Sequence, residues 1–201
     1  MVHLSTNLPR PHSQRRLCRK SKLTQHEYIF IAVSIILGLA ITRLLHTVAM
    51  LTRAYKRVIF HWSSAIWAFS IMLYILQLWW VGWGLRVIEE WTFQNFIVLV
   101  FGSASLYGAA EMALSSPEDE VLDMLQVSQQ LGRLSALSML LYFLVGPYVN
   151  IVMYNNAIVP SIAIPLLGMV LMVLVIIKPA RFSAWSFLFA LYSLTVLVLT
   201  V

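Results

Sequence analysis

Cysteine and charge are both scarce in this chain. Cys18 is the only cysteine among 201 residues, so the chain forms no internal disulfide and no cysteine-based metal cluster. Charged residues make up only 11% of the sequence, and the mean hydropathy is +0.82, which no soluble domain of this size matches. The sequence also contains no H-E-x-x-H motif, no G-x-S-x-G motif and no glycine-rich phosphate loop. We therefore predict a membrane protein that is not an enzyme and holds no cofactor.

Long apolar stretches fill the chain instead. A hydrocarbon core about 30 Å thick is crossed by roughly 20 apolar residues in a helix. Tryptophans near the ends of the second and third stretches are typical of the two membrane interfaces. We predict an all-α, multi-pass bundle that forms one domain over residues 27–201. The six predicted spans cover residues 28–51, 58–82, 91–113, 134–154, 157–177 and 183–201.

The orientation of this bundle is open. Arg53, Lys56 and Arg57 follow the first predicted span, and Lys178 and Arg181 follow the fifth. The positive-inside rule places both loops in the cytoplasm, which in a six-span protein leaves both termini outside. If the first apolar segment did not cross, five crossings would keep every basic cluster inside. We favour six spans, because the first apolar run is strong.

The net charge of +6 comes from the tail over residues 1–26. Such a tail would be attracted to anionic lipid headgroups by about 1 kcal/mol per basic residue near the surface. Its composition is equally that of a disordered segment. The tail has no aromatic platform, so we predict no nucleic-acid partner. Its six basic residues are Arg10, Arg15, Arg16, Arg19, Lys20 and Lys22.

A polar segment precedes the fourth predicted span. Ser116 is a good helix cap, Pro117 suits the first helical position, and the acids that follow complement the helix dipole. Gly132 can end such a helix. The pattern predicts an amphipathic helix over about 117–131 that lies on the membrane surface.

Arg43 is the most unusual residue within a span. An arginine at a membrane centre costs roughly 2.5–3.5 kcal/mol on insertion scales, so it normally has a partner. Glu111 lies near the same membrane side, because the first and third spans run in the same direction. We predict an Arg43–Glu111 pair, either in an ion or proton pathway or as a structural lock. Snorkelling of Arg43 toward the loop is the remaining alternative.

Small residues recur every four positions in the first span. Ser34, Gly38 and Thr42 share one helix face. This spacing lets helix backbones approach closely, which is how helices associate in lipid. We predict a packing face there.

His46 and His61 are the two histidines predicted inside the membrane, and both lie toward the loop between the first two spans. Two histidines at one depth could hold a haem iron from both sides. Histidines at headgroup level are the plainer interpretation.

Two later spans are interrupted by proline. The fourth contains Gly146-Pro147 and Asn150, and the fifth contains Pro160 and Pro165. Proline removes a backbone donor and kinks a helix. Broken helices of this kind form binding sites in carriers, although the two halves of this chain do not look like repeats. Asn150 is also expected to make hydrogen bonds between helices, as are Gln77 and Asn95.

Three short runs resemble a family of bacterial inner-membrane proteins to which no activity is assigned. The run over residues 37–45 reads Leu-Gly-Leu-Ala-Ile-Thr-Arg-Leu-Leu, and the similarity continues in Gln77-Leu78-Trp79-Trp80 and Trp91-Thr92-Phe93. The resemblance covers about the first half of the chain. It implies a bacterial inner-membrane location and no activity.

Three functions therefore stand as hypotheses. The first is movement or gating of a small solute or ion, with Arg43 and Glu111 in the pathway. The second is a non-catalytic accessory subunit whose helices dock on a homo-oligomer or on another membrane protein. The third and weakest is a haem-bearing electron-transfer anchor that uses His46 and His61.

Overall fold

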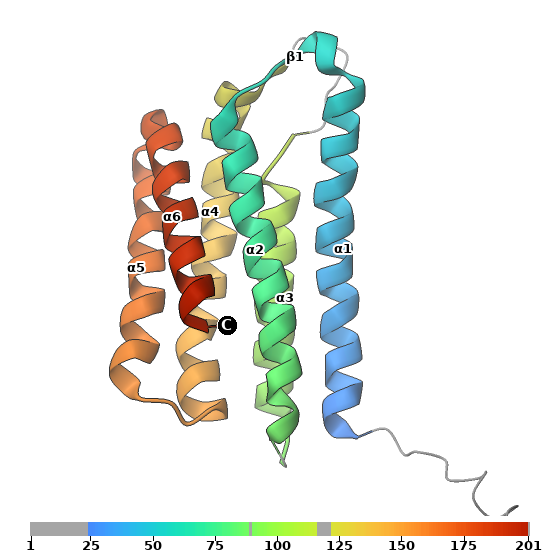
Figure 1. The fold of residues 1–201 in the computed structure, drawn as a ribbon, viewed down its shortest axis with the longest axis vertical. Coiled ribbons are helices and arrows are strands. Elements are labelled where there is room, and N and C mark those ends of the chain that lie inside the picture. The colour runs from blue at the N-terminus through green and yellow to red at the C-terminus, as the bar shows by residue number, and fades with distance from the viewer. Residues whose placement is uncertain (1–23, 89, 116–121, 201) are drawn as a thin grey trace, which may run out of the picture.

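The computed structural model describes residues 24–88, 90–115 and 122–200, and it shows an all-α bundle (Figure 1). Within these ranges, six helices are long and apolar enough to cross a membrane, which confirms the predicted fold class and multi-pass character. Consecutive helices run up and down the bundle. The helices are α1 Gln25–Arg53, α2 Trp62–Gly84, α3 Phe93–Glu111, α4 Met124–Tyr148, α5 Ile158–Ile177 and α6 Phe182–Thr200.

Side-chain caps set where several helices begin. Thr24 and Glu27 form a reciprocal capping box at α1, with the two bonds at 3.2 and 2.7 Å. The ring of His61 accepts a hydrogen bond from the backbone at the start of α2. Thr92 does the same for α3. These polar residues satisfy amide groups that the first helical turn leaves without a partner.

The predicted surface helix over 117–131 is wrong as a separate element. Residues 117–121 lie outside the described ranges, and residues 124–131 are the first two turns of α4 itself. The cap is Asp123, whose carboxylate accepts hydrogen bonds from two backbone amides of the first turn. Gly132 does not end a helix, because α4 continues through it. A β-carbon there would meet Phe182 of α6 at 2.6 Å, so glycine permits a close helix approach.

A short strand pair joins two connections of the chain. Strand β1, Val58–Ile59, pairs in parallel with β2, Leu122–Asp123. The second predicted span, which was drawn from residue 58, therefore begins as a helix only at Trp62. The pair fixes the α1–α2 connection beside the start of α4 (Figure 1).

The arrangement favours six crossings over five. Helix α1 is one continuous helix with the length and hydropathy of a span. Its buried face, which includes Val33, Leu37 and Leu44, belongs to the common core. The α1–α2 and α5–α6 connections then lie at the same end of the bundle (Figure 1).

Serine and aromatic side chains hold the centre of the bundle together. Trp67 is fully buried and packs against Phe182 and Phe189, with ring centroids 5.4 and 4.9 Å away. Its indole N–H donates to Ser135, whose hydroxyl donates to the Ala109 carbonyl. This chain of contacts connects α2, α3, α4 and α6. Buried polar groups here serve helix packing, as expected in lipid.

Candidate functional site

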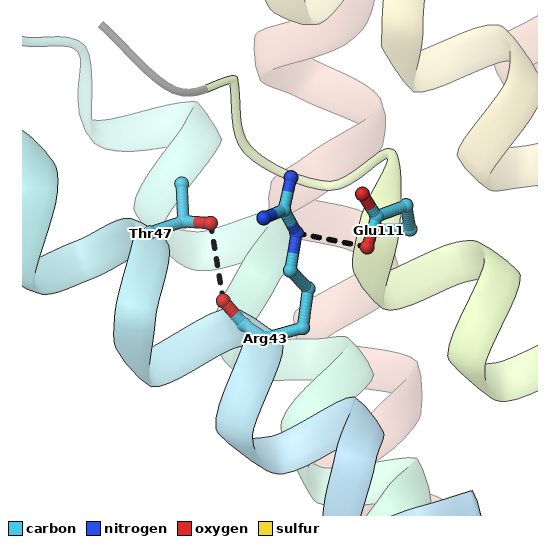
Figure 2. A network of polar contacts seen from close by, with 3 residues as sticks. All are labelled: Arg43, Thr47 and Glu111. Carbon is cyan, nitrogen blue, oxygen red and sulfur yellow. Dashed lines mark hydrogen bonds and ion pairs between the residues drawn. The ribbon is translucent and has the colours of Figure 1, made fainter.

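The structure brings Arg43 and Glu111 together. Arg43 Nε lies 2.8 Å from Glu111 Oε2, which joins the middle of α1 to the last residue of α3 (Figure 2). Thr47 donates to the Arg43 carbonyl at 3.1 Å, a contact within α1. The two predicted partners therefore lie at the same depth, as expected for parallel helices.

The pair lies at the outer side of the bundle. About a third of each side chain is exposed, 34% for Arg43 and 31% for Glu111. Arg43 Nε has no hydrogen-bond partner, so the contact is an ion pair without the geometry of a hydrogen bond. Arg43 is ten residues from the end of α1, about 15 Å along the helix axis. This arrangement is typical of a lock between two helices and does not form an enclosed path.

A second polar region lies between α2, α4, α5 and α6. The side chains there enclose a cavity of about 440 Å³. None of the described residues that line it is charged, and neither Arg43 nor Glu111 is among them. Its polar and aromatic lining residues are Tyr74, Gln77, Tyr142, Phe143, Asn150, Asn156, Ser161 and Tyr192.

Exposure changes from one end of the cavity to the other. Asn156, in the α4–α5 connection, and Pro160, in the first turn of α5, are exposed and form its mouth. Tyr74, Phe143 and Tyr192, farther along the helices, are buried and form its interior. The cavity therefore leads from the α4–α5 connection toward the middle of the bundle.

Irregular backbone forms part of the cavity wall. Pro147 removes the N–H that would bond the Phe143 carbonyl, and Pro165 does the same to the Ser161 carbonyl. Helix α4 then changes to a π-helical turn over Val149–Met153. Such turns occur often at functional sites. In membranes, irregular backbone is tolerated where protein buries it or where it lines a cavity.

One buried hydroxyl beside the cavity lacks a well-formed hydrogen bond. Tyr74 is only 3% exposed, and its hydroxyl lies near the side chains of Tyr192 and Ser193 without a contact that meets hydrogen-bond geometry. By contrast, the Tyr192 hydroxyl donates to the Ile164 carbonyl at 2.7 Å. Buried polar groups are nearly always satisfied in folded proteins, so the Tyr74 hydroxyl is an exception that needs an explanation.

The connection at the mouth is tied to α2. Tyr154 donates its hydroxyl hydrogen to the Val81 carbonyl at 2.8 Å. Burial raises the pKa of the Tyr154 phenol, so the group remains a donor to a higher pH than a free phenol does. Asn155 takes a positive φ of 54°, and the Asn156 amide donates to the Asn150 carbonyl at 2.9 Å. These contacts shape the turn that frames the mouth.

The predicted packing stripe does not pack within this chain. A β-carbon on Gly38 would meet nothing within 4 Å, and Thr42 is exposed. The Thr42 hydroxyl donates to the Gly38 carbonyl of the same helix. The Ser34 hydroxyl is buried without a hydrogen bond. Helix α1 instead buries larger side chains, such as Leu37, so the prediction of close packing by Ser34, Gly38 and Thr42 is wrong inside the chain.

The two candidate haem ligands have other positions. His61 caps α2, and its Nδ1 lies 2.7 Å from the Ser63 hydroxyl. His46 is exposed on α1. Within the described ranges, no group of three or more His, Cys, Asp or Glu residues could hold a metal ion. The haem hypothesis gains no support from these positions.

Sequence reasoning predicted the ion pair but missed the cavity. Asn95 was expected to bond between helices, and Tyr148 of α4 does donate to its side-chain oxygen at 2.9 Å. Asn150 is also predicted to make hydrogen bonds between helices, and in the structure it lines the cavity. The signals available were the three prolines of the fourth and fifth predicted spans, which indicate interrupted helices but do not show which helix faces meet. Tyr74 and Tyr192 carried no signal at all.

Comparison of the chain with family models, curated proteins and solved structures finds no significant match. The resemblance to a bacterial inner-membrane family therefore stays a prediction, and function must be argued from the geometry alone.

Proposed function

We propose that this protein binds a small solute in the cavity between α2, α4, α5 and α6 and passes it across the membrane. The observation that carries the proposal is an uncharged cavity of about 440 Å³ with an interrupted helix in its wall and, beside it, a Tyr74 hydroxyl that lacks a well-formed hydrogen bond. Pockets of roughly 300–1,000 Å³ with a few polar groups are typical of small-molecule sites. A ligand hydrogen bond would satisfy the hydroxyl that the protein leaves unsatisfied.

The broken helices support the same function. Discontinuous helices near the membrane centre form the substrate sites of many secondary transporters. Here Pro165, the π-helical turn and Gly146, which precedes Pro147 in α4, all border one cavity. The proposal moves the solute path away from Arg43 and Glu111, which do not line the cavity.

The proposed location is the bacterial inner membrane, with the α1–α2 and α5–α6 connections in the cytoplasm. Arg53, Lys56 and Arg57 in the first connection, and Lys178 and Arg181 in the second, support this orientation. The cavity mouth then faces the opposite side of the membrane, at the α4–α5 connection.

Thiol labelling tests whether the cavity is a path for solutes. Ser161→Cys, in a Cys18→Ser background, places a thiol in the cavity wall, and Ile162→Cys places one on the outer face of α5 at nearly the same depth. Ser161 is 6% exposed and Ile162 is 43% exposed in the bare protein, but lipid would cover Ile162. In proteoliposomes, we expect a membrane-impermeant thiol reagent to label Ser161→Cys faster than Ile162→Cys when applied from either side.

Two labelling results would contradict the transport proposal. If the two thiols react equally slowly, no aqueous solute reaches the cavity. If Ser161→Cys reacts from one side only, the cavity is a binding site without passage, and the transport proposal fails.

A second candidate function is that of an accessory subunit. The partly exposed stripe of Ser34, Gly38 and Thr42 is a surface on which another membrane helix could pack. The native mass of the protein in mild detergent tests this candidate. A stable complex with other polypeptides supports it, and a single chain of this protein contradicts it.

A further inference from the structure

The cavity wall combines hydrogen-bonding groups with aromatic rings and carries no charge. From this combination we infer that the solute is uncharged and contains a planar ring with an amide-like group that both donates and accepts hydrogen bonds. The inference rests on the proposed solute site and names the chemical class that fits it.

The absence of charge among the described lining residues disfavours charged organic solutes first. A charged ligand that enters a low-dielectric site without an opposite charge loses its hydration and gains no ion pair. Arg43 and Glu111 provide no such charge, because they neutralise each other and lie outside the cavity wall. A neutral solute avoids this cost.

The polar groups of the wall indicate what a neutral solute must offer. Gln77, Asn150 and Asn156 carry carboxamides, each with a donor and an acceptor. The Tyr74 hydroxyl adds a donor that makes no well-formed hydrogen bond within the protein. An amide-like group on the solute can pair with both the hydrogen-bond donors and the hydrogen-bond acceptors of the wall.

The aromatic rings indicate a flat apolar portion. Tyr74 and Phe143 meet edge to face, with centroids 5.3 Å apart, and Phe143 meets Tyr192 at 6.0 Å. These rings belong to residues of the cavity interior. Aromatic surfaces favour another planar ring in stacked or edge-to-face contact.

Three probes of one size separate charge from shape. Benzamide is neutral, benzoate is an anion and protonated benzylamine is a cation, and all three carry the same ring. With the full-length protein in detergent, we expect calorimetry to show benzamide binding at least tenfold more tightly than either charged probe. A charged probe that binds as tightly as benzamide overturns the inference and leaves the solute site standing.

Tyr74→Phe provides the matched variant. It removes only a hydroxyl that makes no well-formed hydrogen bond in the protein, so we expect little change in stability together with several-fold weaker benzamide binding. Equal benzamide affinity in the variant overturns the assigned role of this hydroxyl. If none of the probes binds while the Ser161→Cys thiol reacts from both sides, the chemical class is wrong and the proposed path survives. If none binds and the thiol is unreactive, both proposals fail.

Discussion

The two polar regions of this bundle differ in how their polar groups are satisfied. In the α1–α3 region, opposite charges on Arg43 and Glu111 meet directly, and little remains for a ligand to complete. In the cavity region, uncharged groups surround about 440 Å³, and the Tyr74 hydroxyl is left unsatisfied. A charge in a membrane span is often taken as the mark of a transport path. In this protein the uncharged cavity region is the better candidate for the transport path, because its geometry leaves room for a solute.

Breaking the ion pair should produce the largest change in stability. Glu111→Leu leaves Arg43 without a partner in the membrane, and we expect a loss of about 2–3 kcal/mol in the free energy of unfolding. The double variant Arg43→Leu/Glu111→Leu should recover most of that loss, since no isolated charge remains. Unfolding in mixed detergent micelles measures both.

A charge-swapped protein, Arg43→Glu/Glu111→Arg, is the control for this pair. It should be more stable than either single reversal. If the swap rescues nothing that the single changes lose, the pair does not act as a lock.

Close helix packing near Gly132 should give the next largest effect. In Gly132→Ala, the new methyl group would lie 2.6 Å from Phe182, and overpacking of this kind typically costs about 1–2 kcal/mol. Gly38→Ala is the matched control, because nothing lies within 4 Å of the new methyl group. We expect it to be neutral or slightly stabilising, since alanine favours a helix. Equal destabilisation by both changes would contradict the described packing of α4 against α6.

The hydrogen bond between α3 and α4 should contribute less. Tyr148→Phe removes the donor to the Asn95 side chain. Contacts of this kind average about 0.6 kcal/mol in membrane proteins, so we expect a loss near that value. The Asn95→Ala variant should lose a similar amount, and the double variant should lose little more. Additive losses would show that the two side chains do not act together.

The smallest expected effect depends on pH. The folded pKa of Tyr154 is raised by burial, so the neutral phenol is favoured in the fold and its contribution is present below the ordinary pKa of about 10. As pH rises through the higher folded pKa, that contribution is lost. The stability difference between the wild type and Tyr154→Phe, roughly 0.5 kcal/mol at neutral pH, should therefore disappear at strongly alkaline pH. A difference that grows with pH would contradict the assignment.

Hydropathy predicted the six helices because lipid imposes one length and one composition on every span. Hydropathy was less informative about where each helix begins, because capping side chains determine the first residue of a helix. Ser116 and Pro117 have the chemistry of a helix start, yet within the described residues Asp123 caps α4.

The two polar regions were not equally predictable. Arg43 and Glu111 could be paired from the sequence because charges are so few that each has almost one candidate partner. The cavity depends on which faces of four helices meet, and hydropathy does not contain that information. The small-residue stripe over Ser34, Gly38 and Thr42 misled for the same reason, since spacing defines a face without saying what covers it.

The most direct test of the account compares Tyr74→Phe with Arg43→Leu/Glu111→Leu in one experiment. Benzamide affinity and the free energy of unfolding are measured for both variants and for the wild type. The account predicts that Tyr74→Phe loses affinity and keeps its stability, whereas the double variant keeps its affinity. If the double variant loses benzamide binding while Tyr74→Phe retains it, the solute site lies with the ion pair, and the division between the two regions is wrong.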